Sequence, residues 1–162
     1  MIVVSDTSPI LNLARINRLQ LLASLYQQVL IPSAVYDALV ISRRDLPPAI
    51  DLAALPWLTV AAAVDQNRVR KLREDLDPGE AEAIVLAIER QADLLLVDER
   101  RARRTATAAG LTVSGLLGVV AKAKQAGLID LARPVLDELI QTARFWIGPD
   151  LYKEVLVELG EA

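Results

Sequence analysis

Leu94-Leu95-Leu96-Val97-Asp98 is a short apolar run that ends in an aspartate, and Ile2-Val3-Val4-Ser5-Asp6 repeats the pattern near the start of the chain. Unbroken apolar runs are typical of buried strands in a parallel sheet, where polar residues follow the carboxyl ends. Neighbouring strands lie roughly 4.8 Å apart, and two carboxylates that close do not both stay ionised without a proton or a cation between them. The pattern therefore predicts a divalent metal site at one edge of a sheet.

The composition limits the chemistry that the chain can use. Its 162 residues, 53% of them hydrophobic, suit one compact domain. The absence of cysteine and histidine excludes disulfides, thiol nucleophiles, Ser-His-Asp triads and ordinary zinc sites. Met1 to Val4 is too short for the core of a signal peptide, and no apolar stretch approaches a membrane span. We therefore expect a soluble, cytoplasmic protein without membrane contact.

Strand-like and helix-like segments alternate along the chain, which is typical of an α/β fold with a mainly parallel sheet of about five strands. We expect strands over residues 2–5, 29–32, 57–60, 94–97 and 111–114. Helices are expected over residues 9–26, 33–42, 65–75, 79–91, 100–109, 116–126, 131–143 and 149–159. Pro47-Pro48 and Pro56 mark a loop before the third strand. Residues 1–162 are interpreted as a single domain, with 131–162 a helical extension packed on it.

Asp77-Pro78-Gly79-Glu80 has the pattern of a helix start, with Asp77 as N-cap and Glu80 where a capping-box glutamate stands. On a helical wheel Glu80 lies on the face expected to pack on the sheet, whereas Glu82 and Glu89 lie on the opposite side. Glu80 is therefore either a cap or a site residue.

The aspartates also have structural interpretations. Asp6 precedes Thr7-Ser8-Pro9, a sequence typical of a turn, and Asp98-Glu99 could cap the next helix. Arg100, Arg103 and Arg104 can share one face of that helix, either as solvated charges or as contacts to phosphate. Weaker candidates for such contacts are Arg43, Arg44, Lys122 and Lys124.

Five ordered segments resemble one known family, the PIN-domain nucleases, and within it the VapC-like group that carries the DUF3368 domain. The segments are Val4–Ile10, Leu30–Tyr36, Asp77–Ile84, Leu96–Arg103 and Gly115–Val119. The resemblance implies a three-layer α/β/α fold and Mg²⁺- or Mn²⁺-dependent cleavage of single-stranded RNA. It also implies that Asp6, Glu80 and Asp98 match metal-binding acids and that Ser8 matches a small hydroxyl near the site.

One position departs from the family pattern. A glutamate is expected at position 38, where this chain has Asp37-Ala38. Asp37 and Glu99 are further candidate ligands. The departure motivates an alternative function, a non-catalytic PIN-fold interaction or RNA-binding module. The resemblance also suggests a toxin held by a small antitoxin protein.

The segment 131–161 contains two amphipathic helices whose apolar side chains either complete the core or form a homodimer surface. Aromatic residues make up only 4% of the chain, so no base-stacking site is predicted.

Overall fold

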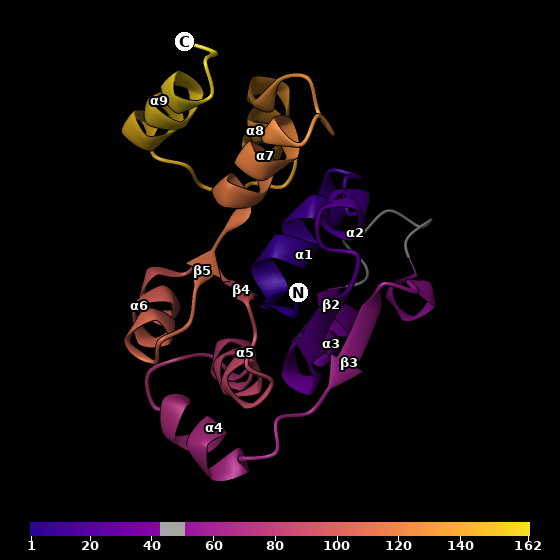
Figure 1. Ribbon diagram of the computed structural model, residues 1–162, viewed down its shortest axis with the longest axis vertical. Helices are drawn as coiled ribbons and strands as arrows, with labels where there is room; N and C mark the ends of the chain where they lie inside the picture. Colours follow the sequence, from indigo (N-terminus) through magenta and orange to yellow (C-terminus); the bar gives the residue numbers. More distant parts are fainter. Residues whose placement is uncertain (43–50) are drawn as a thin grey trace.

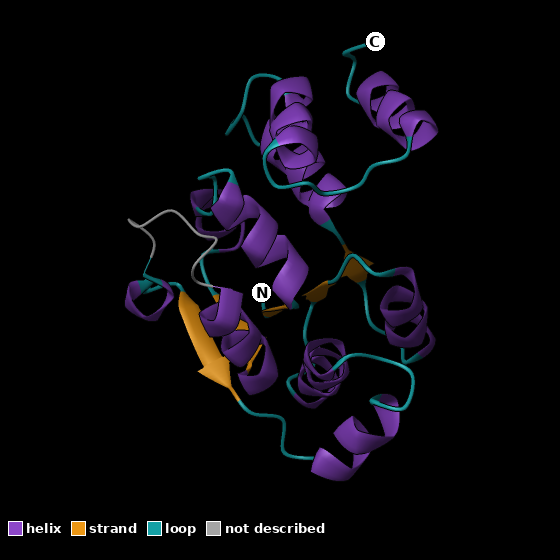
Figure 2. Cartoon of the chain, turned by 180° about the vertical axis from the view of Figure 1, so that it is seen from behind, coloured by secondary structure: helices purple, strands orange, loops and turns teal. Residues whose placement is uncertain are grey.

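The computed structural model describes residues 1–42 and 51–162, which form a five-stranded sheet with helices on both faces (Figures 1 and 2). Its spatial order is β3-β2-β1-β4-β5, and every strand pair is parallel. The strands are β1 (Val3–Ser5), β2 (Val29–Pro32), β3 (Leu58–Ala61), β4 (Leu94–Leu96) and β5 (Val113–Ser114). The predicted α/β fold with a parallel five-stranded sheet is confirmed.

The helices form two layers around this sheet. Their bounds are α1 (Thr7–Arg15), α2 (Gln20–Tyr26), α3 (Ser33–Ile41), α4 (Gln66–Leu72), α5 (Pro78–Glu89), α6 (Arg100–Ala108), α7 (Leu116–Gln125), α8 (Ala132–Gln141) and α9 (Pro149–Glu158), with a 3₁₀ turn, η2 (Leu52–Ala54). Apolar residues of α4, α5 and α6 share one core, and those of α1, α2, α7 and α8 share the other. Val3 and Val4 of β1 point into different cores, so this central strand is buried on both faces, which is why its sequence is an unbroken apolar run.

The prediction of one helix over residues 9–26 is wrong. The chain forms α1 and α2, separated at Asn17, whose φ of 61° is left-handed. The Asn17 and Arg18 amides donate to the carbonyls of Ala14 and Leu13 at 3.1 and 2.9 Å. This is the Schellman pattern of a helix end, and Asn tolerates the left-handed region better than most residues. Because the apolar periodicity continues from α1 into α2, it does not indicate where the first helix ends.

The last two helices lie beside α7 at one end of the molecule (Figure 1). Val135, Leu136 and Leu139 of α8 are buried in the core that includes α1. In α9 only Leu156 is buried. Glu161 fastens the end of the chain, since it pairs with Lys124 Nζ at 2.8 Å and accepts the amide hydrogen of Ala132 at 2.7 Å. We propose that residues 131–162 form an extension of one domain rather than a second one.

No helix in the described parts of the chain is both long and apolar enough to cross a membrane. The predicted loop at Pro47-Pro48 and the candidate contacts Arg43 and Arg44 lie outside the described residues.

Candidate active site

Asp6 and Asp98 follow the two central strands of the sheet. Ser5 is in register with Leu96, and the Asp6 amide donates to the Leu96 carbonyl at 2.9 Å. Both aspartates line a pocket of about 520 Å³ at the carboxyl edge of the sheet. Three further acids line it, namely Asp77, Glu80 and Glu99. The parallel topology therefore gathers five carboxylates, from three separate parts of the sequence, around one cavity.

The Asp6 carboxylate is deeply buried, with 5% of the residue exposed. Burial, and then the negative charges of Asp77, Glu80 and Asp98, raise its pKa from 3.8 to about 7 against the lowering effect of the Thr7 amide. Its Oδ1 atom accepts no hydrogen bond from any described residue. A buried oxygen without a partner is costly, so Asp6 supplies a hard ligand atom that a cation would satisfy.

Asp98 is held from two sides. Its Oδ1 accepts the Leu116 amide hydrogen at 2.7 Å, at the first residue of α7, and its Oδ2 accepts the Ser8 hydroxyl hydrogen at 2.9 Å. Burial raises its pKa, while these two hydrogen bonds and Arg103 lower it. The capping role considered for Asp98 belongs to Glu99, which accepts the amide hydrogens of Arg101 and Ala102. Asp98 is therefore left facing the pocket.

Asn12 is a site residue that sequence reasoning missed. It is buried, and its Nδ2 donates to the Ser8 carbonyl at 2.9 Å and to the Ser8 hydroxyl oxygen at 3.0 Å. Because that oxygen accepts from Asn12, its own hydrogen is free to point at Asp98. The four-residue spacing of Ser8 and Asn12 on one helix was the available signal.

Glu80 forms the predicted helix cap and also lies at the acidic pocket. Its amide donates to Asp77 Oδ1 at 2.7 Å, and its Oε1 accepts the Asp77 amide hydrogen at 3.1 Å, which completes a capping box. It is also buried at the pocket, and burial raises its pKa. Within residues 1–42 and 51–162 no three acidic side chains converge closely enough to hold one ion. Glu80 Oε1 accepts the Asp77 amide hydrogen at the start of the helix, and this bond directs that oxygen toward the backbone instead of toward Asp6 and Asp98.

The residues at the unusual position lie apart from this pocket. Asp37 is exposed on α3 and Ala38 is half-buried, and neither lines the acidic pocket. The acid that approaches α3 is Glu82, which is 6% exposed and accepts the Ala34 amide hydrogen at 2.8 Å. The wheel separated Glu82 from Glu80 correctly but did not indicate its burial. Helix α5 packs against α3, α4, α6 and the sheet, so its side away from Glu80 is also covered.

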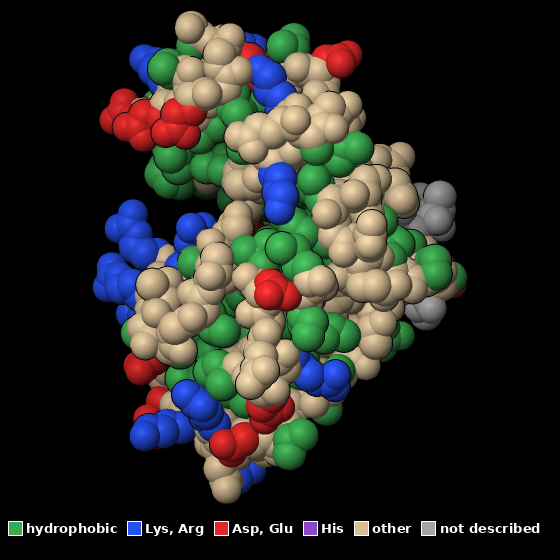
Figure 3. Space-filling model, viewed as in Figure 1, with side chains coloured by type: hydrophobic (Ala, Val, Ile, Leu, Met, Phe, Trp, Pro, Cys, Tyr) green, Lys and Arg blue, Asp and Glu red, His purple; other side chains and the backbone are tan. Residues whose placement is uncertain are grey.

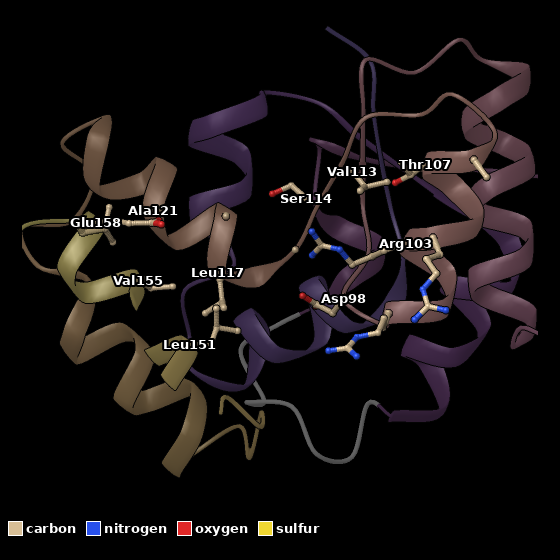
Figure 4. Close-up of a pocket in the computed structure, with 16 residues that line it drawn as sticks. Asp98, Arg103, Thr107, Val113, Ser114, Leu117, Ala121, Leu151, Val155 and Glu158 are labelled. Carbon is tan, nitrogen blue, oxygen red and sulfur yellow. The ribbon is translucent and has the colours of Figure 1, made fainter. Parts of the chain in front are cut away.

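A second pocket, of about 950 Å³, meets the acidic pocket at Asp98. Arg100, Arg103 and Arg104 line it from α6, and Figure 4 shows Arg103 beside Asp98 with Leu117, Leu151 and Val155 across the cavity. In Figure 3 a hollow separates the basic side chains over α6 from the acidic ones over α9. The shared helical face predicted for these three arginines therefore borders one cavity.

Three other basic side chains in the described part of the chain, Arg101, Lys122 and Lys124, contact partners away from the acidic pocket. Arg101 Nη1 donates to the Asp75 carbonyl at 3.3 Å. Lys122 Nζ lies 5.1 Å from the centre of the Tyr26 ring. Lys124 Nζ is paired with Glu161 and also donates to the Leu159 carbonyl. Among the described residues, Arg100, Arg103 and Arg104 are the basic side chains that line a pocket together with Asp98.

The DUF3368 family, described as a PIN domain, matches residues 2–161, a range that includes every strand and helix described above. No curated protein matches the chain.

Proposed function

Since the chain belongs to the DUF3368 family of PIN domains, a fold generally found in nucleases, we propose that it is a metal-dependent endoribonuclease that cleaves single-stranded RNA. The observation that carries this proposal is the pocket that Asp6, Glu80 and Asp98 line together. PIN domains typically use divalent metal ions, and the donor set here consists of carboxylates. The unpartnered Asp6 Oδ1 supports the fit of such an ion.

The proposed ligands are Asp6 and Asp98, with Glu80 joining them once its carboxylate leaves the capping box. Mg²⁺ or Mn²⁺ supplies activated water and charge neutralisation in such sites. The role of Ser8 is to orient Asp98, because its hydroxyl is already directed at Oδ2. Arg103, at the edge of the same cavity as Asp98, is placed to stabilise negative charge on the phosphate oxygens.

The RNA backbone follows the α6 wall in this proposal. Arg100, Arg103 and Arg104 offer guanidinium groups that match phosphate oxygens. The opposite wall includes Glu158, and α9 also exposes Asp150 and Glu154. Because like charges repel, the phosphates are confined to the arginine side. The path then ends at Asp98, where the two pockets meet.

A second candidate function is a non-catalytic PIN-fold module that binds RNA or protein. Two observations favour it: Asp37 lies outside the acidic pocket, and among the described residues no three acids converge at ligand distance. A toxin role is a further part of the nuclease proposal, and it predicts a small antitoxin protein that binds the chain and blocks cleavage.

Cleavage of a labelled single-stranded RNA, with Mn²⁺ or with a chelator, tests the nuclease proposal. We expect metal-dependent products from the wild type and none from Asp6→Asn, with circular dichroism showing that the variant is folded. Asp37→Asn is the matched control, because Asp37 is an exposed acid outside the pocket, and it should cleave as the wild type does. RNA binding by a folded wild type without metal-dependent products would favour the non-catalytic module.

A further inference from the structure

Trp146 is a large aromatic side chain that the fold leaves in solvent beside the acidic pocket. It stands between α8 and α9, and 82% of the residue is exposed. The other tryptophan, Trp57, is only 7% exposed and belongs to the core. Trp146 lines the pocket that also contains Asp6, Glu80 and Asp98. Exposure of so large an apolar ring to water is unfavourable, and a bound molecule that covered the ring would remove this cost.

The backbone on both sides of Trp146 is anchored. Ala143 and Ile147 are buried in the core. The chain turns at Arg144, whose φ is 58°, and the Phe145 amide donates to the Leu139 carbonyl at 2.8 Å. With its neighbours held in place, Trp146 presents its ring without requiring the loop to become ordered on binding.

Gly148 supports the ring from the protein side. A Cβ atom at Gly148 would lie 3.3 Å from Cη2 of Trp146 and 3.9 Å from both Cζ2 and Cζ3. The six-membered part of the indole therefore rests close to the Gly148 backbone, and most of the remaining ring surface is open. Because only the edge of the indole around Cη2 lies this close to Gly148 and most of the residue is exposed, the ring is suited to stacking with a second flat ring.

We propose that Trp146 stacks on a base of the RNA strand next to the phosphate held at the acidic pocket. This inference rests on the proposed ribonuclease function. Bases of single-stranded RNA are free to splay out and stack on aromatic side chains, and the contact tolerates any base because each has a π face. One aromatic ring beside several carboxylates suits a nucleotide. The ring would contact the base, and a cation bound by the carboxylates would hold the phosphate.

Intrinsic fluorescence tests the proposal without catalysis. In buffer that contains Mg²⁺, wild-type protein is titrated with a cleavage-resistant phosphorothioate single-stranded RNA oligonucleotide and with an abasic oligonucleotide of the same backbone, length and charge. Because Trp57 is buried, we expect quenching of Trp146 emission by the RNA and little by the abasic strand. Trp146→Phe should remove the quenching but keep most of the affinity. Trp146→Ala should weaken RNA binding by roughly 5- to 150-fold, the equivalent of about 1–3 kcal/mol per stacked base.

Steady-state cleavage with Mn²⁺ supplies the second readout. We expect Trp146→Ala to raise KM with little change in kcat, and Trp146→Phe to restore KM. Equal RNA affinity and equal KM for wild type and Trp146→Ala would overturn the stacking proposal. Metal-dependent cleavage by both proteins would still support the nuclease proposal. Dissociation of a wild-type oligomer in Trp146→Ala, with RNA binding unchanged, would instead assign the ring to a protein interface. No RNA binding or cleavage by the wild type would overturn both.

Discussion

The Ser8 hydroxyl donates a 2.9 Å hydrogen bond to Asp98 Oδ2 and so joins the first turn of α1 to the segment after β4. Asn12 fixes the direction of that donor, since its Nδ2 lies 3.0 Å from the Ser8 hydroxyl oxygen. Asp98 is thus oriented by α1 on one side and by the start of α7 on the other. The position of this carboxylate depends on contacts from two other parts of the chain.

Ser8→Ala should lower cleavage about 10- to 150-fold, because a hydrogen bond to a charged group contributes about 1.5–3 kcal/mol when its partner is held in place. Ser8→Thr keeps the hydroxyl and should restore most of the rate. Single-turnover cleavage of RNA by the three proteins measures the effect. Equal rates for wild type and Ser8→Ala would remove Ser8 from the site.

Gly115→Ala should reduce cleavage and metal binding, because a Cβ at this position would press on Asp98 Oδ1 and lie 2.9 Å from Arg103 Nη1. The Asp98 oxygen cannot move away freely, since it accepts the Leu116 amide hydrogen. Gly118→Ala is the matched control in α7. Its Cβ would meet only the Ser114 side chain, which can rotate, and alanine favours a helix by up to about 1 kcal/mol. Mn²⁺ titration followed by thermal shift compares the two variants, and comparable metal affinity would contradict this account.

The metal-free protein should lose stability as the pH rises through about 7. Burial raises the pKa of Asp6 from 3.8 to about 7, so the folded state binds a proton that the unfolded chain has released. The stabilising effect of that proton is complete below pH 3.8 and disappears above the folded-state pKa. Burial shifts Glu80 and Asp98 in the same direction. In a chelating buffer the melting temperature should fall between about pH 4 and about pH 7, less steeply for Asp6→Asn than for wild type. Parallel pH profiles for the two proteins would contradict the prediction.

Glu82→Gln should destabilise the fold by about 1–3 kcal/mol, because it weakens the buried acceptor of the Ala34 and Ala63 amide hydrogens. Glu89 offers the comparison on the same helix. It accepts the amide hydrogens of Val64 and Asp65, each at 2.8 Å, but is exposed, so water can replace it. Urea denaturation should show a larger loss for Glu82→Gln than for Glu89→Gln. The opposite order would show that burial does not set the contribution of these carboxylates.

Arg103→Ala should weaken RNA binding and reduce its salt dependence, since a phosphate contact releases counterions. Arg101→Ala is the control on the same helix, because that side chain donates to the Asp75 carbonyl rather than lining the arginine pocket. Fluorescence anisotropy at several salt concentrations measures both slopes. Equal RNA affinity and equal salt dependence for the two variants would contradict the proposal that the α6 arginines contact the RNA phosphates.

Local patterns in the sequence were sufficient for the strands, most helices and the capping box. Asp77 and Glu80 form that box through contacts three residues apart, and such short-range contacts are visible in sequence. The break at Asn17 was missed because its signal is one residue with a left-handed backbone, within an apolar pattern that continues across it.

The sequence by itself determined that two apolar strands end in aspartates, because an unbroken apolar run must be buried. It also determined that these ends meet at one edge of a parallel sheet, because strands that alternate with helices run in the same direction. Only the tertiary structure decided which acids face a cavity. Glu99 rather than Asp98 caps α6, and Asp98 is held at the pocket by Ser8 and Leu116, whereas Glu82 is buried against α3. The exposure of Trp146 beside Asp6 was likewise decided by the tertiary structure. The physical reason is that exposure and hydrogen bonding depend on what other elements pack against a side chain, and such long-range contacts leave no local pattern.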